Sequence, residues 1–201
     1  MPEKSLDLTK YKLKLPDAEV YFIPDFFTPE ESDLYFAELS QSINWKQESI
    51  KLFGRDLPMP RLTAWYGDKS YTYSGLKNEP QPWAPVLLQL KSKIEKITGQ
   101  HYNSVLLNRY RSGQDSMGWH SDNEQELGLQ PGIASISFGA ERRFSFRHRI
   151  NKDLKPLSIN LTNGSLLLMQ GATQRNWLHS LPKTTKPISE RINLTFRYIK
   201  T

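Results

Sequence analysis

The sequence predicts a mainly β (α+β) fold, an antiparallel double-sheet barrel or jelly roll with helices packed outside it. Two patterns of helical spacing occur before Gly99. After Gly99, short apolar runs follow one another closely, and turn residues such as Gly113, Gly139 and Gly164 separate them. The runs that we expect to be strands lie at residues 105–110, 133–138, 144–147, 157–161, 165–169 and 192–199.

The first helix has a clear start signal. Residues 20–23 predict a short strand ahead of it. Thr28 is followed by Pro29 and Glu31, a pattern typical of an N-cap, a first-turn proline and a capping box. We therefore expect a helix that runs to about residue 40 and turns three side chains inward, namely Leu34, Tyr35 and Leu39.

A second helix should follow Pro80 and Pro82 and stop at Gly99. Its apolar residues recur at helical spacing: Val86, Leu87, Leu90, Ile94 and Ile97. Between the two helices, residues 43–52 look extended, Phe53-Gly54 looks like a turn, and residues 61–66 predict another strand.

The chain of 201 residues is long enough for one domain with a sizeable core. Residues 1–19 are polar and contain Pro2 and Pro16, so we expect an N-terminal lead-in that is loosely attached. Residues 20–201 should form the single domain, since no repeat or linker divides them.

Composition excludes several classes of protein. No apolar run approaches the roughly 18 residues that span a bilayer, and the first residues lack the apolar segment of a secretory signal. We therefore expect no membrane attachment. The absence of cysteine excludes disulfides and thiolate metal sites and fits an intracellular protein. The net charge of +6 is compatible with a plain basic surface or with a polyanionic partner, and composition does not decide between them.

His120 and Asp122 form a His-x-Asp pair. Residues i and i+2 of a strand share a face, so both side chains can reach one ion while Ser121 turns away. Such a pair is common by chance, but His179 follows after a strand-rich segment, and a jelly roll would return it beside the first strand. Two imidazoles and one carboxylate on an octahedral ion leave three positions open, the facial triad of non-haem Fe(II) oxygenases.

Arg191 and Arg197 lie six residues apart and therefore on the same strand face as Asn193 and Thr195. This face is either a solvated outer face or a source of buried positive charge near the metal, and the His-x-Asp and His179 spacing favours the second. A buried charge is unfavourable without a partner, and arginine binds carboxylates in a bidentate manner. The second alternative therefore predicts a small dicarboxylate, held by two arginines and the metal.

Seven segments carry a resemblance that covers the chain from about residue 60 to residue 201. In order they are Asn108-Arg-Tyr110, Trp119-His-Ser-Asp122, Ala134-Ser-Ile-Ser137, Arg143-Phe-Ser-Phe-Arg147, Gly164-Ser-Leu-Leu167, His179-Ser-Leu-Pro182 and Arg191-Ile-Asn-Leu-Thr-Phe-Arg197. Together they resemble the AlkB family of Fe(II)/2-oxoglutarate dioxygenases, nearest to its DNA-repair members. The resemblance implies a double-stranded β-helix, which is a jelly roll, with flanking N-terminal helices.

The resemblance also implies the cofactors and the residues that hold them. Fe(II) would be bound by the catalytic residues His120, Asp122 and His179. The co-substrate 2-oxoglutarate would be held at its distal carboxylate by Arg191, and O2 would be the other co-substrate. Four further residues would complete the 2-oxoglutarate site: Asn108, Tyr110, Thr195 and Arg197.

Upstream, residues 45–80 resemble the nucleotide-recognition lid of the family. Phe53 would be the apolar finger that fills the gap left by a flipped base, with core packing as the alternative. Tyr71 and Tyr73 share a strand face and would stack on the flipped base, with ordinary packing as the alternative. The remaining expected substrate-binding residues are Arg61, Glu124 and Asn123, the last at a position where an aspartate is expected.

The expected function is oxidative demethylation of N-alkylated bases such as 1-methyladenine and 3-methylcytosine in DNA. The partner would be alkylated DNA, single- or double-stranded, or RNA, and the chain should act as a monomer in the cytoplasm of a bacterium or the nucleus of a eukaryote. The same chemistry on RNA or on a protein, and a non-catalytic nucleic-acid binder, remain open as alternatives. The basic residues expected to contact phosphates are Arg61, Arg142, Arg143, Arg147 and Lys152.

Overall fold

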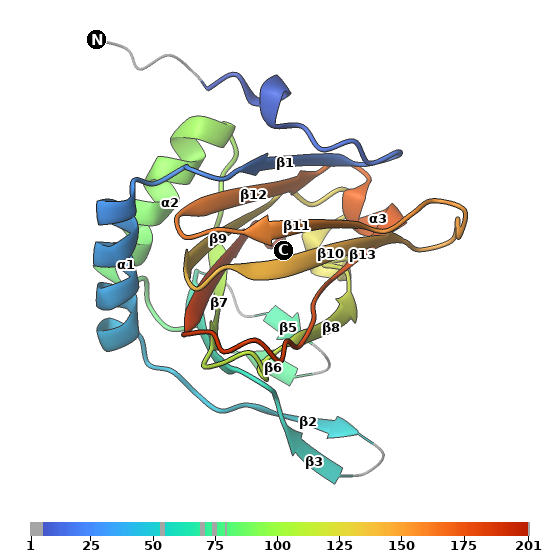
Figure 1. The fold of residues 1–201 in the computed structure, drawn as a ribbon. Coiled ribbons are helices and arrows are strands. Elements are labelled where there is room, and N and C mark those ends of the chain that lie inside the picture. Colours follow the sequence, from blue (N-terminus) through green and yellow to red (C-terminus); the bar gives the residue numbers. More distant parts are fainter. Residues whose placement is uncertain (1–5, 53–54, 69–70, 74–75, 79, 201) are drawn as a thin grey trace.

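Two antiparallel sheets form the body of the protein (Figure 1). The structure is a computed structural model that describes residues 6–52, 55–68, 71–73, 76–78 and 80–200. The six-stranded sheet has the order β1 (Glu19–Ile23), β12 (Ser165–Gln170), β9 (Ile133–Gly139), β14 (Arg191–Arg197), β7 (Ser104–Tyr110) and β4 (Leu62–Gly67). The four-stranded sheet has the order β11 (Leu157–Leu161), β10 (Arg142–His148), β13 (Trp177–Leu181) and β8 (Met117–His120). The predicted jelly roll is confirmed.

Side chains from the inner faces of both sheets share one core cluster. Val20, Ile133 and Leu167 come from the six-stranded sheet, and Phe146 and Trp177 come from the four-stranded sheet. Because the two sheets bury these side chains against each other, they form a sandwich, and the polar residues of the inner faces are enclosed with them.

Helices α1 (Pro29–Ser42) and α2 (Pro85–Thr98) cover the outer face of the six-stranded sheet (Figure 1). Ile192, Leu194 and Phe196 of β14 are fully buried in the same cluster as the apolar residues of these helices. Side chains alternate along a strand, so the other residues of β14 face the second sheet. This alternation delivers four polar side chains to the interior of the sandwich.

Helix α1 begins as predicted but turns a different face inward. Thr28 and Glu31 form both hydrogen bonds of a capping box. Ser32 and Leu39 are buried and lie two turns apart on one face, whereas Leu34 lies on the opposite side and is 72% exposed. The prediction that Leu34 points inward is wrong. A small residue is needed at Ser32, because the Gly164 turn approaches its hydroxyl closely.

Helix α2 confirms its predicted boundaries and buried face. Pro85 occupies its first turn, and Gly99 ends it with a left-handed φ of 65°. Val86, Leu87, Leu90 and Ile94 are buried, as their spacing indicated. Three shorter helical segments complete the set in the described part of the chain: η1 (Leu8–Tyr11), η2 (Gln125–Leu127) and α3 (Thr173–Asn176). No helix in these parts of the chain has the length and apolar character needed to cross a membrane.

The described part of the N-terminal lead-in is attached to the body. The backbone N–H of Leu13 donates to Val20 O at 2.8 Å, and the indole Nε1 of Trp177 donates to Pro16 O at 2.8 Å. Leu15 is buried in the core cluster shared by the two sheets. For residues 6–18, therefore, the expected loose attachment is wrong, because apolar side chains in this polar segment reach the core.

Two hairpins form small sheets of their own. Strands β2 (Ser49–Leu52) and β3 (Arg55–Pro58) pair with each other and form a separate two-stranded sheet, as do β5 (Tyr71–Tyr73) and β6 (Leu76–Asn78). The β2–β3 hairpin projects from the body (Figure 1). Its predicted turn at Phe53-Gly54 lies outside the described residues.

Candidate metal centre and co-substrate pocket

The three predicted metal ligands lie together. His120 ends β8, Asp122 follows two residues later, and His179 lies on the neighbouring strand β13 directly opposite His120. One ligand atom from each of the three side chains lies within 4.8 Å of the other two. The jelly roll thus brings residues that are far apart in the sequence close enough to bind a single ion.

Asp122 enters the site because the strand ladder ends before it. The β8–β13 pairing shifts register between His179 and Leu181, and β8 stops at His120. His120 and Asp122 both line the same cavity, whereas the hydroxyl of Ser121 accepts a hydrogen bond from Arg149 Nη2 at 2.6 Å. The predicted alternation across this pair is therefore present.

The protonation states of two of these residues suit a cation. Burial opposes ionisation of Asp122, but the neighbouring Arg197 guanidinium outweighs it and holds the pKa of this carboxyl below its usual range. Arg197 Nη2 also donates to Asp122 Oδ1 at 2.8 Å. Burial, and then the neighbouring His120, lower the pKa of His179 to about 3. At neutral pH the site thus offers a carboxylate and a neutral imidazole.

His120 and His179 are each oriented by a neighbour. His120 Nδ1 lies 2.9 Å from Gly118 O, so a proton on Nδ1 donates to that carbonyl and leaves the lone pair on Nε2. The ring of His179 stacks on Phe144 with centroids 5.3 Å apart. Two nitrogen donors and one oxygen donor, with no thiolate, match Fe(II) in a facial triad.

All eight residues predicted to hold metal or 2-oxoglutarate line one cavity between the sheets. They are His120, Asp122 and His179, together with Asn108, Tyr110, Arg191, Thr195 and Arg197. Arg191 and Arg197 are buried, so the alternative of a solvated outer face is wrong for β14. The apolar walls include Leu106, Met117 and Phe144, which the sequence analysis did not identify.

Arg191 is a buried cation that lacks a carboxylate partner within the described chain. Its Nη2 donates to Ser137 Oγ at 2.8 Å, while Nε and Nη1 have no acceptor among the described residues. Burial lowers the pKa of Arg191 to about 10, which leaves it protonated at neutral pH. Such a group needs an anion, and the bidentate fork of a guanidinium matches a carboxylate. The cavity therefore fits 2-oxoglutarate.

Polar side chains on β9 and on β14 itself orient the rest of this pocket. Asn193 Nδ2 donates to Ser135 Oγ at 2.8 Å, and Thr195 Oγ1 donates to Asn193 Oδ1 at 3.2 Å. Ser135 lines the cavity, and Ser137 holds Arg191. These serines were not predicted from the sequence, although the polar–apolar alternation in Ala134-Ser-Ile-Ser137 is the signal that could have found them.

The expected substrate-binding residues are only partly described. Phe53 and the side chains of Tyr71 and Tyr73 lie outside what the structure describes. Asn123 is exposed, and neither it nor Glu124 lines the cavity. Glu124 Oε2 is buried with no donor among the described residues. Their contacts with substrate stay predictions.

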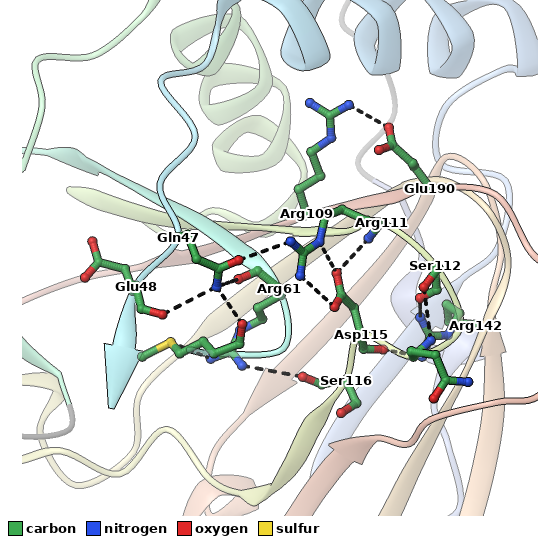
Figure 2. A network of polar contacts seen from close by, with 12 residues as sticks. Gln47, Glu48, Arg61, Arg109, Arg111, Ser112, Asp115, Ser116, Arg142 and Glu190 are labelled. Atoms are coloured by element: carbon green, nitrogen blue, oxygen red, sulfur yellow. Dashed lines mark hydrogen bonds and ion pairs between the residues drawn. The ribbon is translucent and has the colours of Figure 1, made fainter. Parts of the chain in front are cut away.

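Arg61 and Arg142 take part in a network of polar contacts within the protein (Figure 2). Arg61 is 5% exposed, and its Nε donates to Asn108 Oδ1 at 2.8 Å. Arg142 is 3% exposed, and it donates to three backbone carbonyls, those of Ser112, Asp115 and Pro182. Because protein acceptors occupy both buried guanidiniums, the prediction of phosphate contacts is wrong for them. It stays a prediction for Arg143, Arg147 and Lys152, which are exposed.

A polar network ties the β2–β3 hairpin to the loop that leads into β8 (Figure 2). Gln47 Nε2 donates to Met59 O at 2.7 Å at the base of the hairpin, and Gln47 Oε1 accepts from Arg111 Nη1 at 3.1 Å. Arg111 Nε and Nη2 donate to the two oxygens of Asp115 at 2.7 and 2.9 Å. The hairpin is therefore anchored to the strand that carries His120.

Asp115→Asn should lower the free energy of unfolding in a pH-dependent manner. Burial opposes ionisation of Asp115, but its hydrogen bonds with Arg111 hold its pKa below the usual 3.8. A depressed pKa contributes stability above the unfolded value and loses it as the pH falls through the folded value. We expect a loss of roughly 1–2 kcal/mol at pH 7 that shrinks below about pH 4, measured by chemical denaturation. Asp153→Asn, at an exposed carboxyl, is the control, and a pH-independent difference would contradict this account.

Comparison with known proteins gives relatives over most of the chain. Residues 19–197 match the family described as the 2OG-Fe(II) oxygenase superfamily. Alpha-ketoglutarate-dependent dioxygenase alkB homolog 3 of Bos taurus is 45% identical over 190 residues, 90% of this chain and 66% of that protein. DNA oxidative demethylase ALKBH2 of Homo sapiens is 41% identical over 184 residues, 86% of this chain and 70% of that protein. The chain spans 64–66% of the alkB homolog 3 proteins of Bos taurus and Rattus norvegicus.

A solved structure supports the same architecture. The chain is similar to OsALKBH1 with a TM-score of 0.66 at 16% identity, over 89% of this chain and 96% of that one. At this identity the similarity supports the fold alone. The family match also confirms the predicted cofactors Fe(II), 2-oxoglutarate and O2, which the donor set and the buried Arg191 fit. The chain belongs to the 2OG-Fe(II) oxygenase superfamily and, within it, to the AlkB family.

Proposed function

We propose that the chain is an oxidative demethylase that repairs N-alkylated bases such as 1-methyladenine and 3-methylcytosine in DNA. One observation carries the proposal. The cluster of His120, Asp122 and His179 adjoins a pocket in which the buried Arg191 has no anionic partner among the described residues. Relatives named DNA oxidative demethylase, at 41% and 35% identity, support the choice of DNA. The net charge of +6 suits a polyanionic partner.

When bound, Fe(II) with 2-oxoglutarate and O2 supplies the oxidising power that hydroxylates an N-methyl group, whose carbon then leaves as formaldehyde. The chain contributes position and charge. Arg191 orients the distal carboxylate of 2-oxoglutarate, and Arg197 holds the Asp122 carboxylate in place. The apolar side chains Leu106, Met117 and Phe144 exclude water from the reacting groups.

The substrate is held outside this pocket, in our proposal, by the segment around residues 45–80 and by exposed basic residues. Phe53 is the finger, Tyr71 and Tyr73 stack on the target base, and Asn123 and Glu124 contact it. Arg143 and Arg147, which are exposed, contact phosphates. The protein acts as a monomer, and a DNA substrate places its work in the cytoplasm of a bacterium or the nucleus of a eukaryote.

The decisive experiment compares one methylated sequence as single-stranded DNA, duplex DNA and RNA. Formaldehyde and succinate are both measured in reactions that contain Fe(II), 2-oxoglutarate and O2. We expect formaldehyde from DNA with the native chain and none with His120→Ala, because a ligand is lost. Retention of demethylation by His120→Ala would show that the metal assignment is wrong. If formaldehyde formed only with RNA, or with none of the oligonucleotides, the DNA substrate would be overturned. The oxygenase chemistry would stand, provided that succinate still formed.

Arg191→Gln should raise the KM for 2-oxoglutarate by roughly 10- to 100-fold, because a charge-assisted pair with a carboxylate is lost. The measurement is succinate formation against 2-oxoglutarate concentration at saturating oligonucleotide. Arg175→Gln removes an exposed arginine on α3 and should leave this KM unchanged. Equal KM values for Arg191→Gln and the native chain would remove Arg191 from the co-substrate site.

Phe53→Ala should weaken repair of duplex DNA by about tenfold while sparing single strands, because only a duplex leaves a gap for the finger to fill. The measurement is kcat/KM for the same methylated sequence in both forms. Equal losses on the two substrates would indicate that Phe53 is a packing residue rather than a finger.

A further inference from the structure

Gln174 is a fully buried amide that contacts a metal ligand. It lies in the four-residue helix α3, and its side chain is 1% exposed. Its Oε1 accepts the backbone N–H of Asp122 at 3.0 Å, across 52 residues of sequence. Its Nε2 lies 3.5 Å from Met169 Sδ on β12. Both polar atoms of the amide therefore have a partner, and one partner belongs to the candidate metal centre.

The Asp122 N–H needs an acceptor from outside the strand ladder. Strand β8 stops at His120, and the register of the β8–β13 pair has already shifted at that point. Asp122 is 2% exposed, so water does not replace the missing ladder bond. A buried N–H without an acceptor is strongly unfavourable. Gln174 supplies that acceptor, and it fixes the backbone of Asp122 as Arg197 fixes the carboxylate.

The position of α3 gives this contact a further consequence. The helix connects β12 to β13, and Gln174 lies five residues before His179. The segment that carries one metal ligand therefore also holds the backbone of another. Hydrogen bonds of this kind, from residues that do not touch the metal, commonly set ligand orientation and metal affinity.

We propose that Gln174 is a positioning residue of the metal centre, which sets the distance between the Asp122 carboxylate and the His179 imidazole before a metal binds. The proposal rests on the metal site of the proposed function. A residue that only filled space in α3 could be apolar, but an apolar residue would leave the buried Asp122 N–H without an acceptor. The pairing of Gln174 with Asp122, rather than with its own helix, favours the positioning role.

The test is titration of the metal-free protein with Co(II), followed by calorimetry and by the absorption spectrum of the bound ion. Gln174→Leu removes the acceptor at similar volume, and we expect Co(II) affinity to fall by about 10- to 100-fold, with an altered spectrum. The matched control is Thr173→Val in the same helix. Thr173 is equally buried and bonds Glu19 N and Gln170 O, not Asp122. It should lower thermal stability but leave Co(II) affinity and spectrum unchanged.

If Gln174→Leu bound Co(II) with the affinity of the native protein, the proposal would be overturned. If Gln174→Leu and Thr173→Val lost Co(II) affinity equally, it would also be overturned, because that result would indicate a packing role for α3. If Gln174→Leu does not fold, amide hydrogen exchange of the metal-free native protein decides. The Asp122 N–H should exchange as slowly as those of β13, and rapid exchange would overturn the proposal. If the native protein binds Co(II) but releases no formaldehyde from any oligonucleotide, the proposed DNA substrate fails while the role of Gln174 stands.

Discussion

The strict alternation of side chains along β14 is the constraint on which the rest of the structure depends. One face of this central strand is apolar and packs against α1 and α2, while the other carries Arg191, Asn193, Thr195 and Arg197 into the sandwich. A shift of one residue would place two arginines in the apolar core. The many apolar contacts on the helix side therefore hold two buried cations in place on the other side.

The two buried arginines are balanced in different ways. Arg197 forms an ion pair with Asp122 inside the protein, so its charge is neutralised by the same carboxylate that faces the metal. Arg191 has only neutral partners among the described residues, and its charge remains available to an anion that comes from solution. A single cavity thus contains the paired charge of Arg197 and the unpaired charge of Arg191. The difference between these two charges orients an incoming dicarboxylate.

Much of the fold could be predicted from the sequence because local rules govern it, whereas the metal centre, whose residues are distant in the sequence, was predicted from the order of its motifs. The capping box at Thr28, the left-handed Gly99 and the period of two in β14 depend on near neighbours. What could not be predicted depends on distant ones. Leu34 is exposed because α1 buries the opposite face, which carries Ser32 and Leu39. Arg61 and Arg142 are buried because Asn108 on β7 and backbone carbonyls of residues 112 and 115 accept their hydrogen bonds. Gln174 has no signal of its own, since its acceptor role arises only where β8 ends.

The placement of the metal ligands also affects the stability of the four-stranded sheet. Strand β8 has four residues, lies at the edge of its sheet and, among the described strands, pairs only with β13. A cation held by His120, Asp122 and His179 would cross-link this edge to its neighbour and close a loop of 59 residues, from 120 to 179. Closing a long loop reduces the conformational entropy of the unfolded chain, as a disulfide does. A bound ion would therefore link one edge of this sheet to its neighbour, a role that a disulfide cannot take in a chain without cysteine.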